Sequence, residues 1–178
     1  MCLKNSSVLI RNILGYLRMN KNVSEETLNQ IYECINILEE TNDFKYIYRK
    51  YDYKLAFLEN PGYNTIFDES NSYYLIAVTL GHSVEQLIKT LSKTDVSKMV
   101  IMDACASALL ELKADEFEKT LGCNLTKRFC PGYGTTDILD LKIIHKELKA
   151  DRIGIELNES CMMIPQKSML GIIGIKSN

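Results

Sequence analysis

Seven consecutive residues in the C-terminal half carry the side chains best suited to binding chemistry, Arg128-Phe129-Cys130-Pro131-Gly132-Tyr133-Gly134. The arginine offers a planar fork of donors that matches a carboxylate or a phosphate. The tyrosine ring can stack on a flat base or face a ligand cation. Pro131-Gly132 predicts a tight turn, because proline presets φ and glycine supplies a positive φ. Glycine also lets a ligand approach the main chain closely, since it has no Cβ.

Two interpretations of this stretch are open from the residue types alone. The cation, the aromatic ring and the accessible main chain together suit a zwitterionic ligand with a flat base, such as S-adenosylmethionine. Alternatively, the stretch is a surface Pro-Gly turn whose tyrosine, Tyr133, packs on the core. Which interpretation holds therefore depends on the helices and strands that position residues 128–134.

Composition narrows the class of protein. The 178 residues are 46% apolar and 25% charged, which is typical of an ordinary globular chain, and we expect one domain over 1–178. The net charge is −2, with 21 basic and 23 acidic residues interspersed, so nucleic acid is not an expected partner. The apolar runs are too short to span a membrane, and no signal-peptide pattern is present, so we expect a cytoplasmic location without membrane association.

The cysteines do not form a recognisable metal or redox motif. Six are scattered along the chain without a Cys-x-x-Cys pair, so each is expected to be a free thiol in a reducing compartment. The spacing of Cys123, Cys130 and His145 matches no zinc pattern, and we expect no metal site.

Hydrophobic periodicity predicts the elements of the N-terminal half. We expect helices over 6–18 and 25–40, strands over 44–49 and 72–80, a turn at 60–62, and a helix that opens at 81–83. Ser24 and Ser83 are the expected N-caps of the second and third helices. His82, at the start of the third helix, is expected to be a solvated or capping residue, because the sequence offers no partner for a catalytic base.

The C-terminal half is expected to begin with a long helix over 96–121, closed by Gly122. Within it, Glu111 is flanked by leucines and lies either on the wet face or in a position held for function, the wet face being the simpler interpretation. The remaining predicted elements are a helix over 138–149 capped by Asp137, a strand over 152–157, a turn-rich connection over 158–167 and a strand over 168–175.

Helices and strands mix without regular βαβ alternation. The sequence therefore predicts an α+β fold, a largely antiparallel, twisted sheet flanked by helices in one domain. Within this domain, we expect an N-terminal part over 1–95 and a motif-bearing part over 96–178.

Three segments, in order, resemble the activation (S-adenosylmethionine-binding) domain of vitamin B12-dependent methionine synthase. Arg128, Gly132 and Tyr133 match the pattern Arg-x-x-x-Gly-Tyr. The segment 158–168 (NESCMMIPQKS) resembles the Thr-Glu-Ser and Met-x-Pro segment ahead of the last strand of that domain. The long helix, with Asp103-Ala104 and then Glu111 to Asp115 (ELKAD), resembles its ligand-facing helix. The resemblance covers roughly residues 103–175.

This resemblance implies a function in reactivation. In that family, the activation domain holds S-adenosylmethionine over a cobalamin carried by another domain. When the cobalamin is oxidised to cob(II)alamin, an electron donor such as a flavodoxin reduces it, and methyl transfer from S-adenosylmethionine pulls that unfavourable reduction forward. The expected partners are thus a cobalamin-binding methionine synthase chain and the electron donor, with S-adenosylmethionine as the bound cofactor.

The resemblance also assigns roles to individual residues. It implies that Arg128 binds the ligand carboxylate and that the main chain around Cys130 supplies donors and acceptors. Gly132 would permit this close approach, and Tyr133 would line the site. Glu111 would face the positively charged or hydroxyl groups of the ligand, which favours the functional interpretation of this carboxylate. No residue of the chain is expected to be catalytic.

Two departures from the fused enzymes affect the expected site. Those enzymes continue beyond the final strand and use a tyrosine pair there, so with the sequence ending at Asn178 we expect that contact to be absent or replaced. They also use an N-terminal aspartate, for which Asp43 and Asp52 are candidates. The sequence lacks an Asp-x-His-x-x-Gly motif and a Gly-rich strand-to-helix fingerprint, so cobalamin binding and a Rossmann fold are not expected.

We therefore expect a separately encoded activation domain that acts on its corrinoid enzyme in trans. A hypothesis of another class is a docking module that caps the corrinoid protein without binding the methyl donor. A third hypothesis is reactivation of a different corrinoid methyltransferase.

Overall fold

The computed structural model describes residues 7–20 and 23–176, so the predicted helix start at residue 6 lies outside the described residues. In the N-terminal part the elements are α1 (Ser7–Tyr16), α2 (Glu25–Thr41), β1 (Lys45–Tyr51), the 3₁₀ helix η2 (Ala56–Glu59), α3 (Pro61–Asn64), β2 (Ser70–Thr79) and α4 (His82–Thr94). The C-terminal part contains α5 (Val96–Glu118), α6 (Asp140–Leu148), the 3₁₀ helix η3 (Ala150–Ile153), β3 (Glu156–Leu157), β4 (Met163–Ile164) and β5 (Ser168–Lys176).

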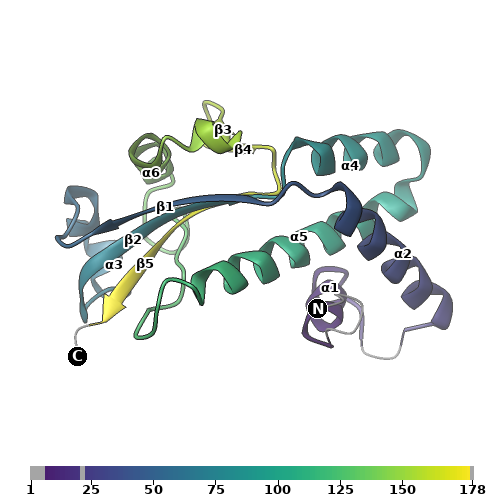
Figure 1. Ribbon diagram of the computed structural model, residues 1–178, viewed down its shortest axis with the longest axis horizontal. Helices are drawn as coiled ribbons and strands as arrows, with labels where there is room; N and C mark the ends of the chain where they lie inside the picture. Colours follow the sequence, from purple (N-terminus) through teal and green to yellow (C-terminus); the bar gives the residue numbers. More distant parts are fainter. Residues whose placement is uncertain (1–6, 21–22, 177–178) are drawn as a thin grey trace.

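The main sheet is antiparallel throughout, in the order β1-β2-β5. Its central strand, β2, pairs Ala77 with Ile47 of β1 on one side and with Leu170 of β5 on the other. The sheet thus joins strands from both predicted parts of the chain (Figure 1). A separate two-stranded sheet pairs β3 with β4. The predicted α+β fold with an antiparallel sheet is confirmed.

Both faces of the main sheet are covered. Successive side chains of a strand point to opposite faces. Ile76 and Val78 accordingly belong to a core cluster that includes buried residues of α1, α2, α4 and α5, whereas Leu75 and Ala77 belong to a second cluster with residues of α3 and α6. Figure 1 shows α5 along one face of the sheet and α6 on the opposite face. Burial on both faces explains the nearly continuous apolar sequence of β2.

The outer edge of β5 is covered by the extended segment 124–129. Phe129 and Ile172 exchange two main-chain hydrogen bonds of 2.9 and 2.8 Å. The amide of Thr126 donates to the carbonyl of Gly174 at 2.9 Å. This pairing fixes Arg128 over β5, where an added Cβ at Gly171 would lie 3.0 Å from its Cγ. The hydrogen bonds of this segment to β5 therefore fix the position of the first residues of the motif.

The helix α5 forms the other support of the motif. It begins at an N-cap, Asp95, whose carboxylate accepts from the amide of Lys98 at 2.9 Å. The buried alanines Ala104, Ala106 and Ala108 allow close approach by neighbouring elements, and α5 packs against α1, α2 and α4. Among the described residues, no helix is both long enough and apolar enough to cross a membrane.

Several local predictions differ from the structure. The third predicted helix is capped by Gly81, not by Ser83, because a positive φ of 85° at the glycine ends the preceding strand. Asp137 caps a preliminary turn by accepting from the amide of Leu139 at 2.9 Å, and α6 begins only at Asp140. The predicted turn at 60–62 instead begins the short helix α3, with Asn60 as its cap.

The predicted strand over 152–157 is largely wrong. Lys149 and Gly154 adopt left-handed conformations with φ of 53° and 82°, and the four residues between them form η3. Only Glu156–Leu157 is a strand. Of the alternating apolar residues in this stretch, Ile153 ends η3, Ile155 is buried after it, and Leu157 lies in β3.

Candidate ligand-binding site

A cavity of about 270 Å³, here named the central pocket, lies between α5, the motif turn and the segment that leads into β5. Its lining comes from five parts of the chain: Tyr16, Ser107, Leu110, Glu111, Cys130, Pro131, Tyr133, Leu141, Met163, Gln166, Lys167, Ser168 and Met169. Three of the residues implicated by the sequence, Glu111, Cys130 and Tyr133, thus line one cavity. Arg128 and Gly132 are not part of this lining.

The motif turn has the geometry expected of Pro131-Gly132. Gly132 has a φ of 98°, and an added Cβ would lie 3.2 Å from Cγ1 of Ile138. Its amide donates to Oγ1 of Thr136 at 3.1 Å, and that hydroxyl in turn donates to the carbonyl of Tyr133 at 2.8 Å. Thr136 is buried, and its two hydrogen bonds hold the turn in this conformation. Gly132 therefore shapes the pocket wall through its conformation.

Two tyrosines border the central pocket. Tyr133 is 71% exposed, so it does not pack on the core as the alternative interpretation of the motif requires. Tyr16, at the end of α1, is 51% exposed and lines the same cavity. Partial burial raises the pKa of the Tyr16 phenol, and the nearby Glu111 and Tyr133 add to this shift while Arg128 opposes it. Nothing in the sequence marks Tyr16 as a site residue, because it ends an ordinary amphipathic helix.

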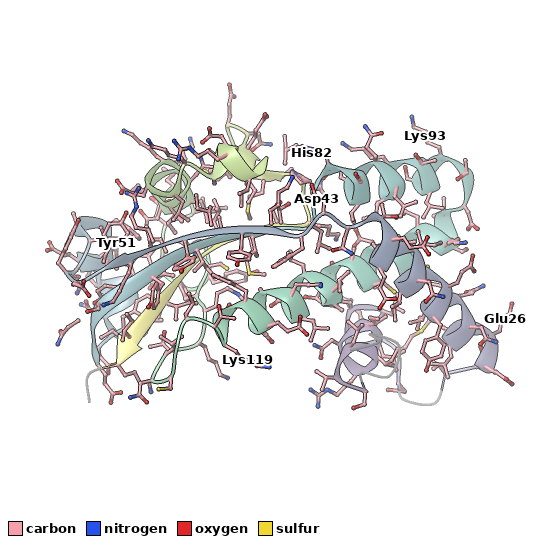
Figure 2. All side chains as sticks on the ribbon, in the orientation of Figure 1. Glu26, Asp43, Tyr51, His82, Lys93 and Lys119 are labelled. Atoms are coloured by element: carbon pink, nitrogen blue, oxygen red, sulfur yellow. The ribbon has the colours of Figure 1, made fainter. Side chains whose placement is uncertain are left out.

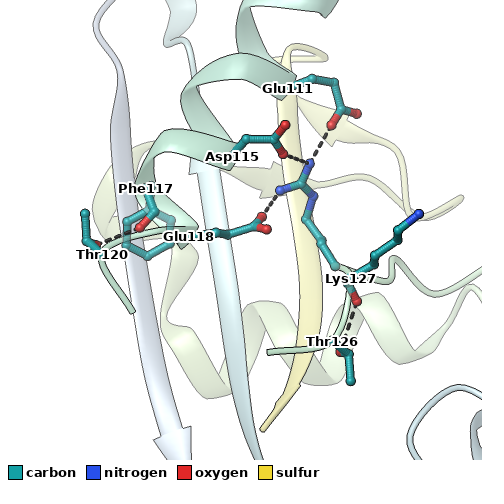
Figure 3. Close-up of polar contacts among 8 residues, drawn as sticks. Glu111, Asp115, Phe117, Glu118, Thr120, Thr126 and Lys127 are labelled. Atoms are coloured by element: carbon teal, nitrogen blue, oxygen red, sulfur yellow. Dashed lines mark hydrogen bonds and ion pairs between the residues drawn. The ribbon is translucent and has the colours of Figure 1, made fainter. Parts of the chain in front are cut away.

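Arg128 is occupied by carboxylates from one face of α5. Its guanidinium lies 2.5 Å from Glu111 and 3.4 Å from Asp115, and it also pairs with Glu118 (Figure 3). These acids recur at helical spacing, so they point to the same side of α5. The side chain of Arg128 is only 9% exposed. The predicted contact between Arg128 and a ligand carboxylate stays a prediction, but the geometry gives this arginine an evident structural role.

The Arg128 cluster leaves negative charge at the pocket. Three carboxylates share one guanidinium, so two negative charges are uncompensated within the cluster. Glu111, with 39% of its side chain exposed, carries this charge to the lining of the central pocket. A cationic ligand group is therefore favoured on this side of the pocket.

Cys130 contributes a neutral thiol to the lining. Burial raises its pKa to about 11, with Arg128 lowering it and Glu111 raising it further. At neutral pH the thiol is therefore protonated and is a poor nucleophile. This is compatible with a reactive ligand such as a sulfonium, which a thiolate would attack.

A cation, Lys167, also lines the central pocket. The ammonium of Lys167 donates to Ser107 Oγ at 2.9 Å and pairs with Asp103 at 2.8 Å. Its side chain is 13% exposed. The sequence placed this lysine in a turn-rich connection, and nothing in the spacing of Ser107 and Lys167 indicated that β5 and α5 would bring them together.

Neither candidate for the N-terminal aspartate lines the central pocket. Asp43 pairs with Lys45 at 2.5 Å, and Asp52 pairs with Lys50 at 2.6 Å. Figure 2 shows Asp43 at the start of β1 and Tyr51, the neighbour of Asp52, at its far end. In the same figure His82 marks the start of α4, where its Nε2 lies 3.1 Å from the carbonyl oxygen of Gly154.

The structure also shows the surroundings of Cys123 and His145, which the sequence analysis considered for a metal site, and of two methionines near the site. Cys123 is exposed, and Nε2 of His145 lies 2.7 Å from the carbonyl oxygen of Ile155. Across residues 7–20 and 23–176, no cluster of three or more His, Cys, Asp or Glu side chains could hold a metal ion. Met163 lines the central pocket, whereas Met162 is 53% exposed.

Two further cavities adjoin the central pocket. The outer cavity, of about 490 Å³, shares Tyr16 and Glu111 with it and is also lined by Arg11 and Asp115. The side cavity, of about 130 Å³, shares Lys167 with it. Small-molecule sites occupy about 300–1,000 Å³. The central pocket and the outer cavity together reach that range.

Comparison with known proteins identifies the fold. No family model matches the sequence, and no curated protein sequence matches it. The structure is similar to the crystal structure of the MetH reactivation domain bound to AdoHcy, with a TM-score of 0.68 and 15% sequence identity. The likeness covers 92% of this chain and 68% of that one. The chain therefore has the fold of a methionine synthase reactivation domain, which is the fold that the sequence resemblance implies.

Proposed function

We propose that the chain binds S-adenosylmethionine in the central pocket and supports the reductive methylation of cob(II)alamin on a cobalamin-dependent methionine synthase acting in trans. The observation that carries this proposal is the convergence of Glu111, Cys130 and Tyr133 on one cavity. Two separate motifs supply these residues, and the fold is one that holds AdoHcy in the MetH reactivation domain.

The chemistry of the lining supports this ligand. The uncompensated charge around Arg128 favours the sulfonium and the α-ammonium group of S-adenosylmethionine. The exposed ring of Tyr133 offers a stacking surface for the adenine base. The neutral thiol of Cys130 does not compete with the methyl acceptor, since its pKa of about 11 keeps it protonated.

The contribution of the chain is to bind and orient the methyl donor. Cobalamin, carried by the partner, would supply a nucleophilic cobalt once a one-electron donor such as a flavodoxin had reduced it. The sulfonium held by the chain would give up its methyl group to that cobalt without the bonding electrons, so that S-adenosylmethionine would become neutral S-adenosylhomocysteine. Rigid presentation of the methyl group converts an encounter between two large partners into a positioned reaction.

Reconstitution tests the proposed activity. The chain is mixed with a methionine synthase that lacks its own activation domain, with a reductant and with S-adenosylmethionine labelled on the methyl group. We expect labelled methylcobalamin to accumulate only when the chain is present. If the label reaches cobalamin at the same rate without the chain, the proposed activity is wrong.

A second candidate function is docking on the corrinoid protein without binding the methyl donor. The observation that favours it is the occupancy of Arg128 by three carboxylates, which takes up the cation that the family resemblance assigns to the ligand. A pull-down with the cobalamin-bearing enzyme distinguishes the two functions. Capture that strengthens with added S-adenosylmethionine supports the first, and equal capture with and without it supports docking alone.

A further inference from the structure

We propose that Lys167, assisted by Ser107, binds the carboxylate of the amino-acid moiety of the ligand. This inference rests on the proposed function, because it concerns the orientation of S-adenosylmethionine in the central pocket. It assigns a binding role to two residues that lie outside the Arg-x-x-x-Gly-Tyr motif and that meet only in the folded chain.

The ammonium of Lys167 has room for a further acceptor. Asp103 and Ser107 take two of its three N–H groups, at 2.8 and 2.9 Å. Among the residues that the structure describes, no other side chain pairs with this ammonium, which borders both the central pocket and the side cavity. An acceptor on a ligand can thus complete its hydrogen bonds without displacing a protein group.

The main chain holds Lys167 in a fixed position. Its carbonyl accepts from the amide of Leu80 at 2.9 Å, at the end of the central strand. The preceding amide, of Gln166, donates to the carboxylate of Glu85 at 2.5 Å. The following hydroxyl, of Ser168, donates to Oγ1 of Thr79 at 2.8 Å. A pre-organised cation costs less conformational entropy when it binds a ligand.

Lys167 is a better partner for a carboxylate than Arg128. A ligand carboxylate at Arg128 would become the fourth negative group around one guanidinium that is only 9% exposed. Lys167 has one carboxylate partner, Asp103, whose side chain is 45% exposed and can be solvated. Like-charge repulsion is therefore smaller at Lys167.

The lining of the central pocket then matches a zwitterion. It contains one positively charged side chain, Lys167, and one negatively charged side chain, Glu111. With its carboxylate at Lys167, the ligand directs its ammonium or sulfonium group towards Glu111. The same contacts do not favour a serine nucleophile activated by lysine, because the ammonium of Lys167 pairs with Asp103 and the hydroxyl of Ser107 donates to the carbonyl of Asp103 at 3.0 Å.

The test compares two ligands that differ only in the carboxylate, S-adenosylmethionine and decarboxylated S-adenosylmethionine. Calorimetry with the wild-type chain is expected to show about ten- to a hundredfold tighter binding of the first, as for one charge-assisted contact. In Lys167→Met this ratio should fall to about one. The matched control is Lys89→Met, which removes a lysine that also borders the side cavity but is 69% exposed and pairs with Glu85. The control should retain the wild-type ratio.

The outcomes separate the inference from the proposed function. If the wild-type chain binds neither ligand, both are overturned. If it binds the two equally, or if Lys167→Met keeps the full ratio, only the inference is overturned. A ratio that collapses in Arg128→Met but not in Lys167→Met assigns the carboxylate to Arg128 instead. Lys167→Gln, whose amide can keep the hydrogen bond to Ser107, takes the place of Lys167→Met if that variant does not fold.

Discussion

The guanidinium of Arg128 lies 2.5 Å from the carboxylate of Glu111, a residue seventeen positions earlier in the chain. This contact links the segment that carries the motif turn to α5, and both contribute walls of the central pocket. Arg128 is held over β5 by the pairing of the extended segment with that strand. The relationship thus joins helix, turn and sheet at the candidate site.

Removing the arginine should destabilise the fold. Arg128→Met leaves the carboxylate of Glu118, only 17% exposed, without its partner. We expect a loss of about 3 kcal/mol in the free energy of unfolding. This is the lower end of the range for removing one partner of a buried ion pair, because water can solvate Glu111 and Asp115 in the variant. Urea denaturation measures this, with the exposed neighbour Lys127→Met as control. A loss no larger than in the control would remove the structural role of Arg128.

The glycine of the turn should tolerate no side chain. Gly132→Ala places a Cβ 3.2 Å from Ile138 at a φ of 98°. Gly134→Ala meets no neighbour within 4 Å and adds only the strain of a left-handed φ of 63°. We expect Gly134→Ala to cost about 1 kcal/mol and Gly132→Ala clearly more, since strain and crowding add. Equal melting temperatures for the two variants would contradict this account of the turn.

The buried thiol should make stability depend on pH. The pKa of Cys130 is about 11 in the folded chain, compared with an ordinary value of 9.0. Between these values the unfolded chain loses the proton while the folded chain keeps it, so stability falls as pH rises through this window. Relative to Cys130→Ala, the wild-type chain should lose about 2 kcal/mol more between pH 9 and pH 11. If the stability of the two proteins changed equally with pH, burial would not be raising the pKa of this thiol.

The charge of Glu111 should favour a cationic ligand. S-adenosylmethionine carries a sulfonium, whereas S-adenosylhomocysteine is neutral at sulfur. Glu111→Gln keeps the size of the side chain and a hydrogen-bonding oxygen for Arg128 but removes the charge that lines the pocket. We expect its affinity for S-adenosylmethionine to fall about tenfold relative to that for S-adenosylhomocysteine. The control is Asp52→Asn, which removes the charge of an exposed carboxylate outside the pocket. An unchanged ratio of the two affinities in Glu111→Gln would rule out this electrostatic preference.

The periodicity of the sequence predicts most of the fold because burial on both sheet faces leaves clear patterns. The strand β2 is apolar from Tyr73 to Val78, and α2 begins after the predicted cap Ser24, whose hydroxyl accepts from the amide of Thr27 at 3.2 Å. The miss at 152–157 has a physical cause. Left-handed conformations at Lys149 and Gly154 bound a short helical turn, and the apolar alternation of 152–157 runs across the end of that turn.

The sequence predicts fewer features of the candidate site than of the fold. The motif identifies Cys130 and Tyr133 because proline and glycine mark the turn that presents them. Lys167 and Tyr16 carry no such mark, and they reach the pocket only through the antiparallel pairing of β5 with β2 and the packing of α1 on α5. The partners of Arg128 were also hidden, since helical acids are usually solvated.

The most direct test of the central claim is calorimetric titration of the wild-type chain with S-adenosylmethionine, beside Tyr133→Ala and Tyr53→Ala. Both tyrosines are largely exposed, at 71% and 62%, so neither substitution should change stability by more than about 0.5 kcal/mol. The account predicts one ligand per chain, with affinity at least tenfold weaker in Tyr133→Ala, for the loss of base stacking, and unchanged in Tyr53→Ala. Absence of binding by the wild-type chain, or equal affinity in all three proteins, would contradict it.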